Sequence, residues 1–93
     1  MADRGEVTTT QAEIEWEGVL WEVDIETEEG GPLIRLSLWR TKANGSREQV
    51  QAEDPPKDPL TQENVQGWLF ASEVPEPLVH ALAERILQAR AGR

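Results

Sequence analysis

Apolar and acidic residues alternate through the first third of the chain, in Glu13–Glu17 and again in Trp21–Glu26. A period of two is typical of a β-strand, because successive side chains of a strand point to opposite faces. One face would carry Ile and Trp side chains, and the other a row of carboxylates. No Lys or Arg occurs between residues 11 and 29 to neutralise that row. The pattern therefore predicts strand structure with one apolar and one strongly acidic face.

The alternation slips between Trp16 and Trp21, which lie five residues apart and cannot share a face of a regular strand. Gly18 lies inside the slip. A β-bulge in one strand over residues 12–27 would return both tryptophans to the core side. The alternative is two separate strands.

The next strand is predicted over residues 33–42, after a turn at Glu28–Pro32. Ile34, Leu36 and Leu38 alternate with other residues, so we expect these three to face the core. Arg35 then shares the acidic face. Asp24 and Arg35 are an expected cross-strand ion pair, worth about 0.2–1 kcal/mol.

Asn44-Gly45 is a strong hairpin signal, because both residues tolerate the positive φ of a type I′ turn. It predicts a further strand over residues 46–53. A two-residue turn places Trp39 opposite Val50, on the face away from the core. We expect Leu20 to join them there.

Residues 54–75 are predicted to form a Pro-rich linker that contains short elements. Asp58 is the expected N-cap of a short helix over residues 59–66, with Pro59 in its first turn and Gly67 as its stop. The apolar run Trp68–Ala71 then predicts a fourth strand or a buried connection.

The clearest helix is predicted over residues 76–91, with Pro77 in its first turn and Gly92 after its end. Its apolar stripe consists of Leu78, Val79, Leu82, Ile86 and Ala89. The predicted fold is α+β, a three- or four-stranded antiparallel meander with this amphipathic helix packed on one face. Residues 1–11 are expected to be a flexible tail, and residues 12–93 a single domain with its β-meander at 12–53.

Composition excludes several classes of function. The net charge of −9 argues against binding to nucleic-acid phosphates or to an anionic membrane surface. The absence of Cys excludes disulfides, thiolate catalysis and Cys-based zinc sites. No secretory signal and no apolar stretch of about 20 residues is found. We expect a cytoplasmic protein, folded around its four tryptophans.

The sequence predicts no enzyme. The single histidine, His80, falls opposite the apolar stripe of the last helix, beside Glu84. The turn Glu29–Pro32 lacks the Lys and the following helix of a phosphate-binding loop. Carboxylates two residues apart on a strand are separated by about 7 Å, which does not suit a single calcium ion. We predict no catalytic residues, no metal site and no cofactor.

A partner-binding surface is the remaining candidate, because Trp and Arg are enriched at binding hot spots. Either residues 53–70 fold over the outer face, with Trp68 and Phe70 covering Trp39, or Trp39 is exposed as part of an interface. The acidic row either is a solvated face or selects a basic partner. The candidate residues are Trp39, Val50, Leu20, Arg40, Glu15, Glu17, Glu22, Asp24 and Glu26.

The leading hypothesis is a non-catalytic protein–protein interaction module, an adaptor or regulatory subunit with a basic protein partner. Self-association is a second form of it, because a basic cluster (Arg35, Arg40, Lys42, Arg47) could meet the acidic strand of a neighbouring copy. One alternative is an acidic nucleic-acid mimic that inhibits a DNA- or RNA-binding protein. The other is a regulatory domain that binds a small ligand between sheet and helix.

Overall fold

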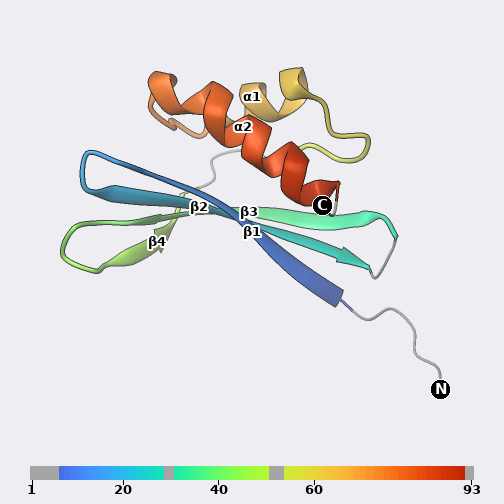
Figure 1. Ribbon diagram of the computed structural model, residues 1–93, viewed down its shortest axis with the longest axis horizontal. Coiled ribbons are helices and arrows are strands. Elements are labelled where there is room, and N and C mark those ends of the chain that lie inside the picture. Colours follow the sequence, from blue (N-terminus) through green and yellow to red (C-terminus); the bar gives the residue numbers. More distant parts are fainter. Residues whose placement is uncertain (1–6, 29–30, 51–53, 92–93) are drawn as a thin grey trace.

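The computed structural model describes residues 7–28, 31–50 and 54–91. Four strands form one antiparallel sheet in the order β1-β2-β3-β4, and both helices lie on the same face of it (Figure 1). The predicted α+β meander with a C-terminal helix on one face is confirmed. The elements are β1 (Val7–Trp16), β2 (Val19–Glu28), β3 (Leu33–Thr41), β4 (Arg47–Gln49), α1 (Gln62–Ala71) and α2 (Glu76–Arg90).

The slip in the acidic alternation is a hairpin turn between β1 and β2. Glu17 and Gly18 both have positive φ, 51° and 79°, as a two-residue type I′ turn requires. The bulge prediction is therefore wrong, and the alternative of two strands is confirmed. The flexible tail expected up to residue 11 is also wrong from Val7 onward, because β1 pairs with β2 along its whole length.

A register shift between β2 and β3 changes which side chain faces the core. Glu26 pairs with Arg35 and Thr27 pairs with Leu33, so Ile34 is an extra residue between the two pairs. Leu33 packs against the core and Ile34 is 47% exposed. The prediction for Ile34 is thus wrong, whereas that for Leu36 and Leu38, both fully buried, is correct.

The hairpin between β3 and β4 has a three-residue loop, not the predicted two-residue turn. Lys42 N donates to Ser46 O at 2.9 Å, and Gly45, with φ of 89°, follows Asn44 inside the loop. The extra residue shifts the register by one. Trp39 pairs with Gln49 and not with Val50. The rest of the strand predicted over residues 46–53 includes 51–53, which lie outside the described residues.

Helix α1 begins later than predicted. Its N-cap is Thr61, whose side chain accepts a hydrogen bond from Asn64 N while Asn64 Oδ1 accepts one from Thr61 N. This reciprocal capping box satisfies two backbone donors that a helix start leaves free. Gly67 lies inside the helix instead of stopping it. Trp68, predicted to lie in a strand or connection, is buried in the helix–sheet core.

Helix α2 confirms the predicted amphipathic stripe, since Leu78, Val79, Leu82 and Ile86 are buried against the sheet. They share one core with side chains of β2, β3 and α1. Pro at the first turn costs little, because its missing N–H would have no partner there. Among the described residues, no helix is both long and apolar enough to cross a membrane.

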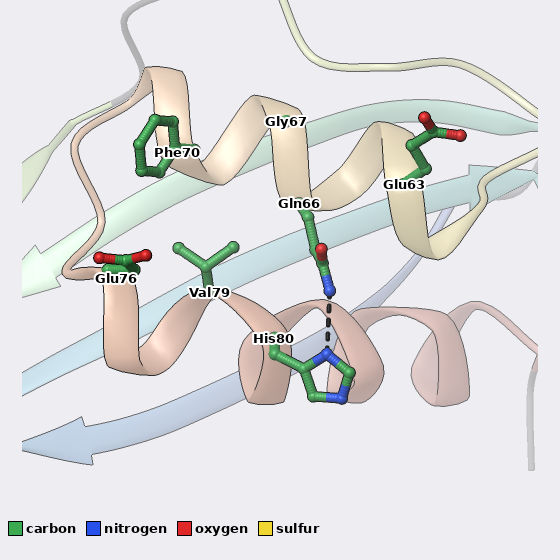
Figure 2. Close-up of a pocket in the computed structure, with 7 residues that line it drawn as sticks. All are labelled: Glu63, Gln66, Gly67, Phe70, Glu76, Val79 and His80. Carbon is green, nitrogen blue, oxygen red and sulfur yellow. Dashed lines mark hydrogen bonds between the residues drawn. The ribbon is translucent and has the colours of Figure 1, made fainter.

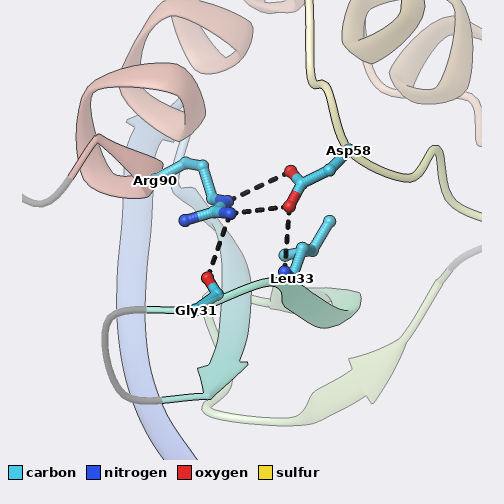
Figure 3. Close-up of polar contacts among 4 residues, drawn as sticks. All are labelled: Gly31, Leu33, Asp58 and Arg90. Carbon is cyan, nitrogen blue, oxygen red and sulfur yellow. Dashed lines mark hydrogen bonds and ion pairs between the residues drawn. The ribbon is translucent and has the colours of Figure 1, made fainter.

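Asp58 ties three segments of the fold together (Figure 3). Its carboxylate accepts hydrogen bonds from Leu33 N at 2.9 Å and from Arg90 Nη2 at 2.6 Å, and Arg90 also donates to Gly31 O at 3.3 Å. The hydrogen bond from Arg90 holds the pKa of Asp58 below its ordinary value, against the opposing effect of burial, and the Leu33 N–H lowers it further. Asp58 therefore acts as a clamp that holds the loop before α1 against the start of β3 and the end of α2. It is not the predicted helix N-cap.

Candidate functional site: the uncovered face of the sheet

The face of the sheet opposite the helices is left uncovered by the described residues (Figure 1). Trp21, Val23 and Ile25 of β2 point to the helix side, where they are buried. Alternation along the paired strands then assigns the other side chains to the uncovered side, which we call the open face. It carries Val7, Thr9, Gln11, Glu13 and Glu15 of β1, Leu20, Glu22, Asp24, Glu26 and Glu28 of β2, Arg35, Ser37, Trp39 and Thr41 of β3, and Arg47 and Gln49 of β4.

Two of the predicted site residues lie on the other side of the sheet. Val50 packs against the core, because the shifted register places it beside Leu38. Arg40 also points to the helix side, where it forms an ion pair with Glu48 and its guanidinium lies 5.6 Å from the centre of the Trp21 ring. Neighbouring residues of a strand cannot share a face. Arg40 thus never belongs to the same patch as Trp39.

The other predicted residues keep their places. Leu20, Trp39 and the carboxylates Glu15, Glu22, Asp24 and Glu26 lie together on the open face, and Glu17 lies in the turn at its end. Glu13, which the candidate set omitted, belongs with them. The sequence could have identified Glu13, because it lies in the same alternating run as Glu15 and Glu17.

Trp39 is half-buried, and neither predicted cover lies over it. Trp68 is in the core on the far side of the sheet, and Phe70 is 65% exposed on α1. Instead, the guanidinium of Arg47 lies over the Trp39 ring, 4.1 Å from its centre. This stacking is a cation–π contact, worth about 0.5–1 kcal/mol at an exposed site.

Arg47 also neutralises part of the acidic row. Its Nε lies 3.3 Å from Glu22 Oε1, and its Nη2 lies 3.8 Å from Asp24 Oδ2. Arg35 pairs with Glu26 at 3.2 Å, directly across the strands, and not with Asp24 as predicted. Three of the four carboxylates of β2, Glu22, Asp24 and Glu26, are thus in ion pairs within the sheet.

We expect Arg47→Ala to lower the free energy of unfolding by about 1–2 kcal/mol, since it removes the cation–π contact and leaves Glu22 and Asp24 beside each other without a cation. Urea unfolding measures the loss. Arg47→Lys is the matched control, because it keeps the charge but loses the planar group that stacks on Trp39, and it should lose about half as much. Equal stability of all three proteins would contradict the role given to Arg47.

Among the described residues, the free acidic groups of the open face are Glu13 and Glu15 on its outermost strand and Glu28 at the end of β2. Glu13 and Glu15 are exposed, and within the described residues neither side chain has a hydrogen-bond or ion-pair partner. Glu17 extends the row into the turn. The negative field of the open face is therefore concentrated along β1, at one edge of the sheet.

A groove of about 500 Å³ between α1 and α2 is the second candidate site (Figure 2). Its lining includes Glu63, Gln66 and Phe70 of α1 and Glu76, Val79 and His80 of α2. It lies between the two helices, whereas the sequence suggested a pocket between helix and sheet. Phe70 gives it an exposed apolar wall.

His80 is exposed beside Glu84, as predicted. Its Nδ1 lies 3.0 Å from Gln66 Nε2 and 3.3 Å from Gln62 Nε2, and its Nε2 lies 3.4 Å from Glu84 Oε2. Amide nitrogens only donate, so Nδ1 accepts and the neutral ring carries its proton on Nε2. Both ring nitrogens are thus engaged, and the groove offers apolar contact and no activated nucleophile.

In the described ranges, no three His, Asp or Glu side chains gather closely enough to hold a metal ion. The carboxylates of the open face spread along the strands and do not converge on one point. We find no match to this chain among protein-family models, curated proteins or solved structures.

Proposed function

We propose that this protein is a non-catalytic interaction domain that binds a basic protein partner through its open face. The observation that carries the proposal is the unpaired state of Glu13 and Glu15 on an uncovered strand, beside carboxylates that are already paired. Solvated charges at a surface edge steer a partner of opposite sign and raise its association rate. The domain would then act as an adaptor or regulatory subunit.

The apolar part of the same face supports this proposal. Leu20 lies across from Glu15 on β1 and from Thr41 on β3, and Trp39 lies on the same face under the side chain of Arg47. Interfaces commonly combine a central aromatic or aliphatic anchor with a charged rim. Leu20 and Trp39 would supply the centre, and the β1 carboxylates the rim.

The two alternative functions have weaker support. A nucleic-acid mimic needs a dense row of free negative charge, but Arg47 and Arg35 pair with three of the four carboxylates of β2 on this face. Binding of a small ligand would fall to the α1–α2 groove, where Phe70 is exposed. The open face remains the better candidate, because free charge and apolar side chains occur there together.

Affinity capture from the native organism's lysate tests the proposal. The immobilised protein is expected to retain basic proteins at low salt and to release them at high salt, because surface charges are screened. The double variant Glu13→Gln, Glu15→Gln should lose most of this retention. The double variant Glu63→Gln, Glu84→Gln makes the same charge change on the helix layer and should retain them like wild type.

Retention that is equal in all three proteins, or insensitive to salt, would overturn the proposal. Release of the captured proteins by added DNA would instead favour the nucleic-acid mimic. Light scattering on the purified protein adds the oligomeric state. A dimer at low salt would favour self-association over a basic partner.

A further inference from the structure

Strand β1 forms an edge of the sheet over all ten of its residues, and no strand pairs with its outer side among the described residues. Arg85 Nη1 donates to Glu13 O at 2.8 Å, so this carbonyl points away from β2. In an antiparallel strand, both backbone groups of a residue point to the same side, and the side alternates along the chain. Gln11 and Glu15 therefore also direct their N–H and C=O groups outward.

Natural edge strands are commonly protected by Pro, by charged side chains such as Lys, by a β-bulge, or by a helix or loop that covers them. β1 contains no Pro or Lys, and its register with β2 runs without a bulge. Its charged residues are Glu13 and Glu15. Opposite charges directly across a sheet attract and like charges repel. This edge therefore disfavours another acidic strand and favours a basic one.

A hollow lies on the helix side of the same edge. It measures about 380 Å³ and is lined by residues 10–13 of β1 and by Arg85, Gln88 and Ala89 of α2. Ala12 and Ala89 are small, so the hollow leaves room for side chains that point inward from a further strand. The same stretch of β1 thus offers outward backbone N–H and C=O groups, negative charge on the open face, and space on the helix side.

We propose that β1 accepts an extended segment of a basic partner as a fifth, antiparallel strand, with Lys or Arg at alternate positions. This inference rests on the proposed function, since it specifies the segment that the acidic face would bind. Residues opposite Gln11 and Glu15 exchange backbone hydrogen bonds with them, and the residue opposite Glu13 donates to Glu13 O in place of Arg85. All three project their side chains onto the open face. The residues between them point into the hollow, where small apolar side chains fit.

A second copy of β1 is the competing occupant. In an antiparallel pair of copies centred on Gln11, Glu13 would meet Thr9 and Glu15 would meet Val7. Neither carboxylate would gain a cation, and the acidic rows of two molecules would be brought together. A basic segment gains two opposite-charge pairs at the same positions, so the charge pattern selects it.

Two eight-residue peptides test strand addition, one with alternating Lys and Val and one with the same residues as a Lys block followed by a Val block. Fluorescence anisotropy of labelled peptide measures the affinity. The alternating peptide should bind about tenfold or more tightly than the block peptide, because it alone matches both faces of the edge. Glu13→Gln with Glu15→Gln should weaken its binding about fivefold or more.

Backbone pairing is tested separately from charge. Gln11→Pro removes an outward N–H and leaves the β1–β2 hydrogen bonds in place, so it should weaken the alternating peptide about fivefold or more relative to Gln11→Ala. If the proline variant does not fold, methylated peptides on the wild-type protein replace it. Methylation of the lysine backbone nitrogens, which face β1, should abolish binding, whereas methylation of the valine nitrogens should be tolerated.

Equal binding of the two peptides, together with equal binding by Gln11→Pro and Gln11→Ala, would overturn strand addition. If Glu13→Gln with Glu15→Gln still weakened both peptides, the acidic face would keep its proposed function. If the lysate capture also failed to depend on these carboxylates, both proposals would fall. A wild-type dimer that Gln11→Pro dissociates would overturn the inference in favour of a second copy.

Discussion

Leu82→Ala is expected to lower the free energy of unfolding by about 2–5 kcal/mol, the range for truncating a buried leucine. Leu82 is 0% exposed and lies in the middle of the apolar stripe by which α2 packs on the sheet. A domain of this size has about 5–14 kcal/mol of stability in total. The variant should therefore lose a substantial share of its stability at 25 °C, with a clearly lower urea midpoint.

Glu84→Ala is the control for the same helix, because Glu84 is exposed and its contact with the exposed side chain of His80 lies at the surface. It should change stability by less than about 0.5 kcal/mol. A loss below about 1 kcal/mol for Leu82→Ala would mean that α2 is not held on the sheet by this stripe. Far-UV circular dichroism, followed through the same urea titration, shows whether helix and sheet unfold together.

Periodicity predicted the elements of this fold, and turn geometry limited the prediction of their register. The period of two located strand structure, and the apolar stripe located α2 almost to the residue. Asn44-Gly45 located a hairpin but not the length of its loop. A one-residue change of register moves every side chain of a strand to the other face. That change took Val50 away from Trp39 and onto the core side.

Long-range contacts account for the remaining errors. Asp58 and Thr61 are both suitable N-caps by residue type, and the choice between them depends on Arg90, which lies 32 residues from Asp58 and pairs with it. The exposure of Ile34 follows from a bulge just after Gly31 and Pro32, residues that predicted a turn but not the register of the strand that follows it. Such contacts exist only once the elements are packed, so local patterns cannot contain them.

The candidate site was predicted only in outline, because one of its residues depends on the register of the β3–β4 hairpin. The acidic row, Leu20 and Trp39 were identified from alternation alone, because alternation decides which face a side chain takes. Arg47, the residue that stacks on Trp39 and pairs with Glu22, was assigned only to a general basic cluster. Its role depends on the register of the β3–β4 hairpin. Because Arg47 pairs with Glu22 and Asp24, it leaves Glu13 and Glu15 without a cation.

Asp58→Asn is expected to lower the free energy of unfolding by about 1–2 kcal/mol near neutral pH. Hydrogen bonds to charged groups contribute about 1.5–3 kcal/mol in general. Partial exposure reduces that value here, since the side chains of Asp58 and Arg90 are 33% and 26% exposed. The clamp joins the loop before α1, the start of β3 and the end of α2, so its loss should loosen all three.

The pH dependence of this difference separates the clamp from a general loss of packing. The pKa of Asp58 is lower in the folded protein than its ordinary value of 3.8, chiefly because of the hydrogen bond from Arg90. The stabilisation is therefore complete above about pH 5 and is lost as the pH falls through the folded-state pKa. Urea unfolding of wild type and variant should show a constant difference at neutral pH that shrinks below about pH 4. A difference that stays constant down to pH values where both proteins unfold would show that the Asp58 charge does not carry the stabilisation.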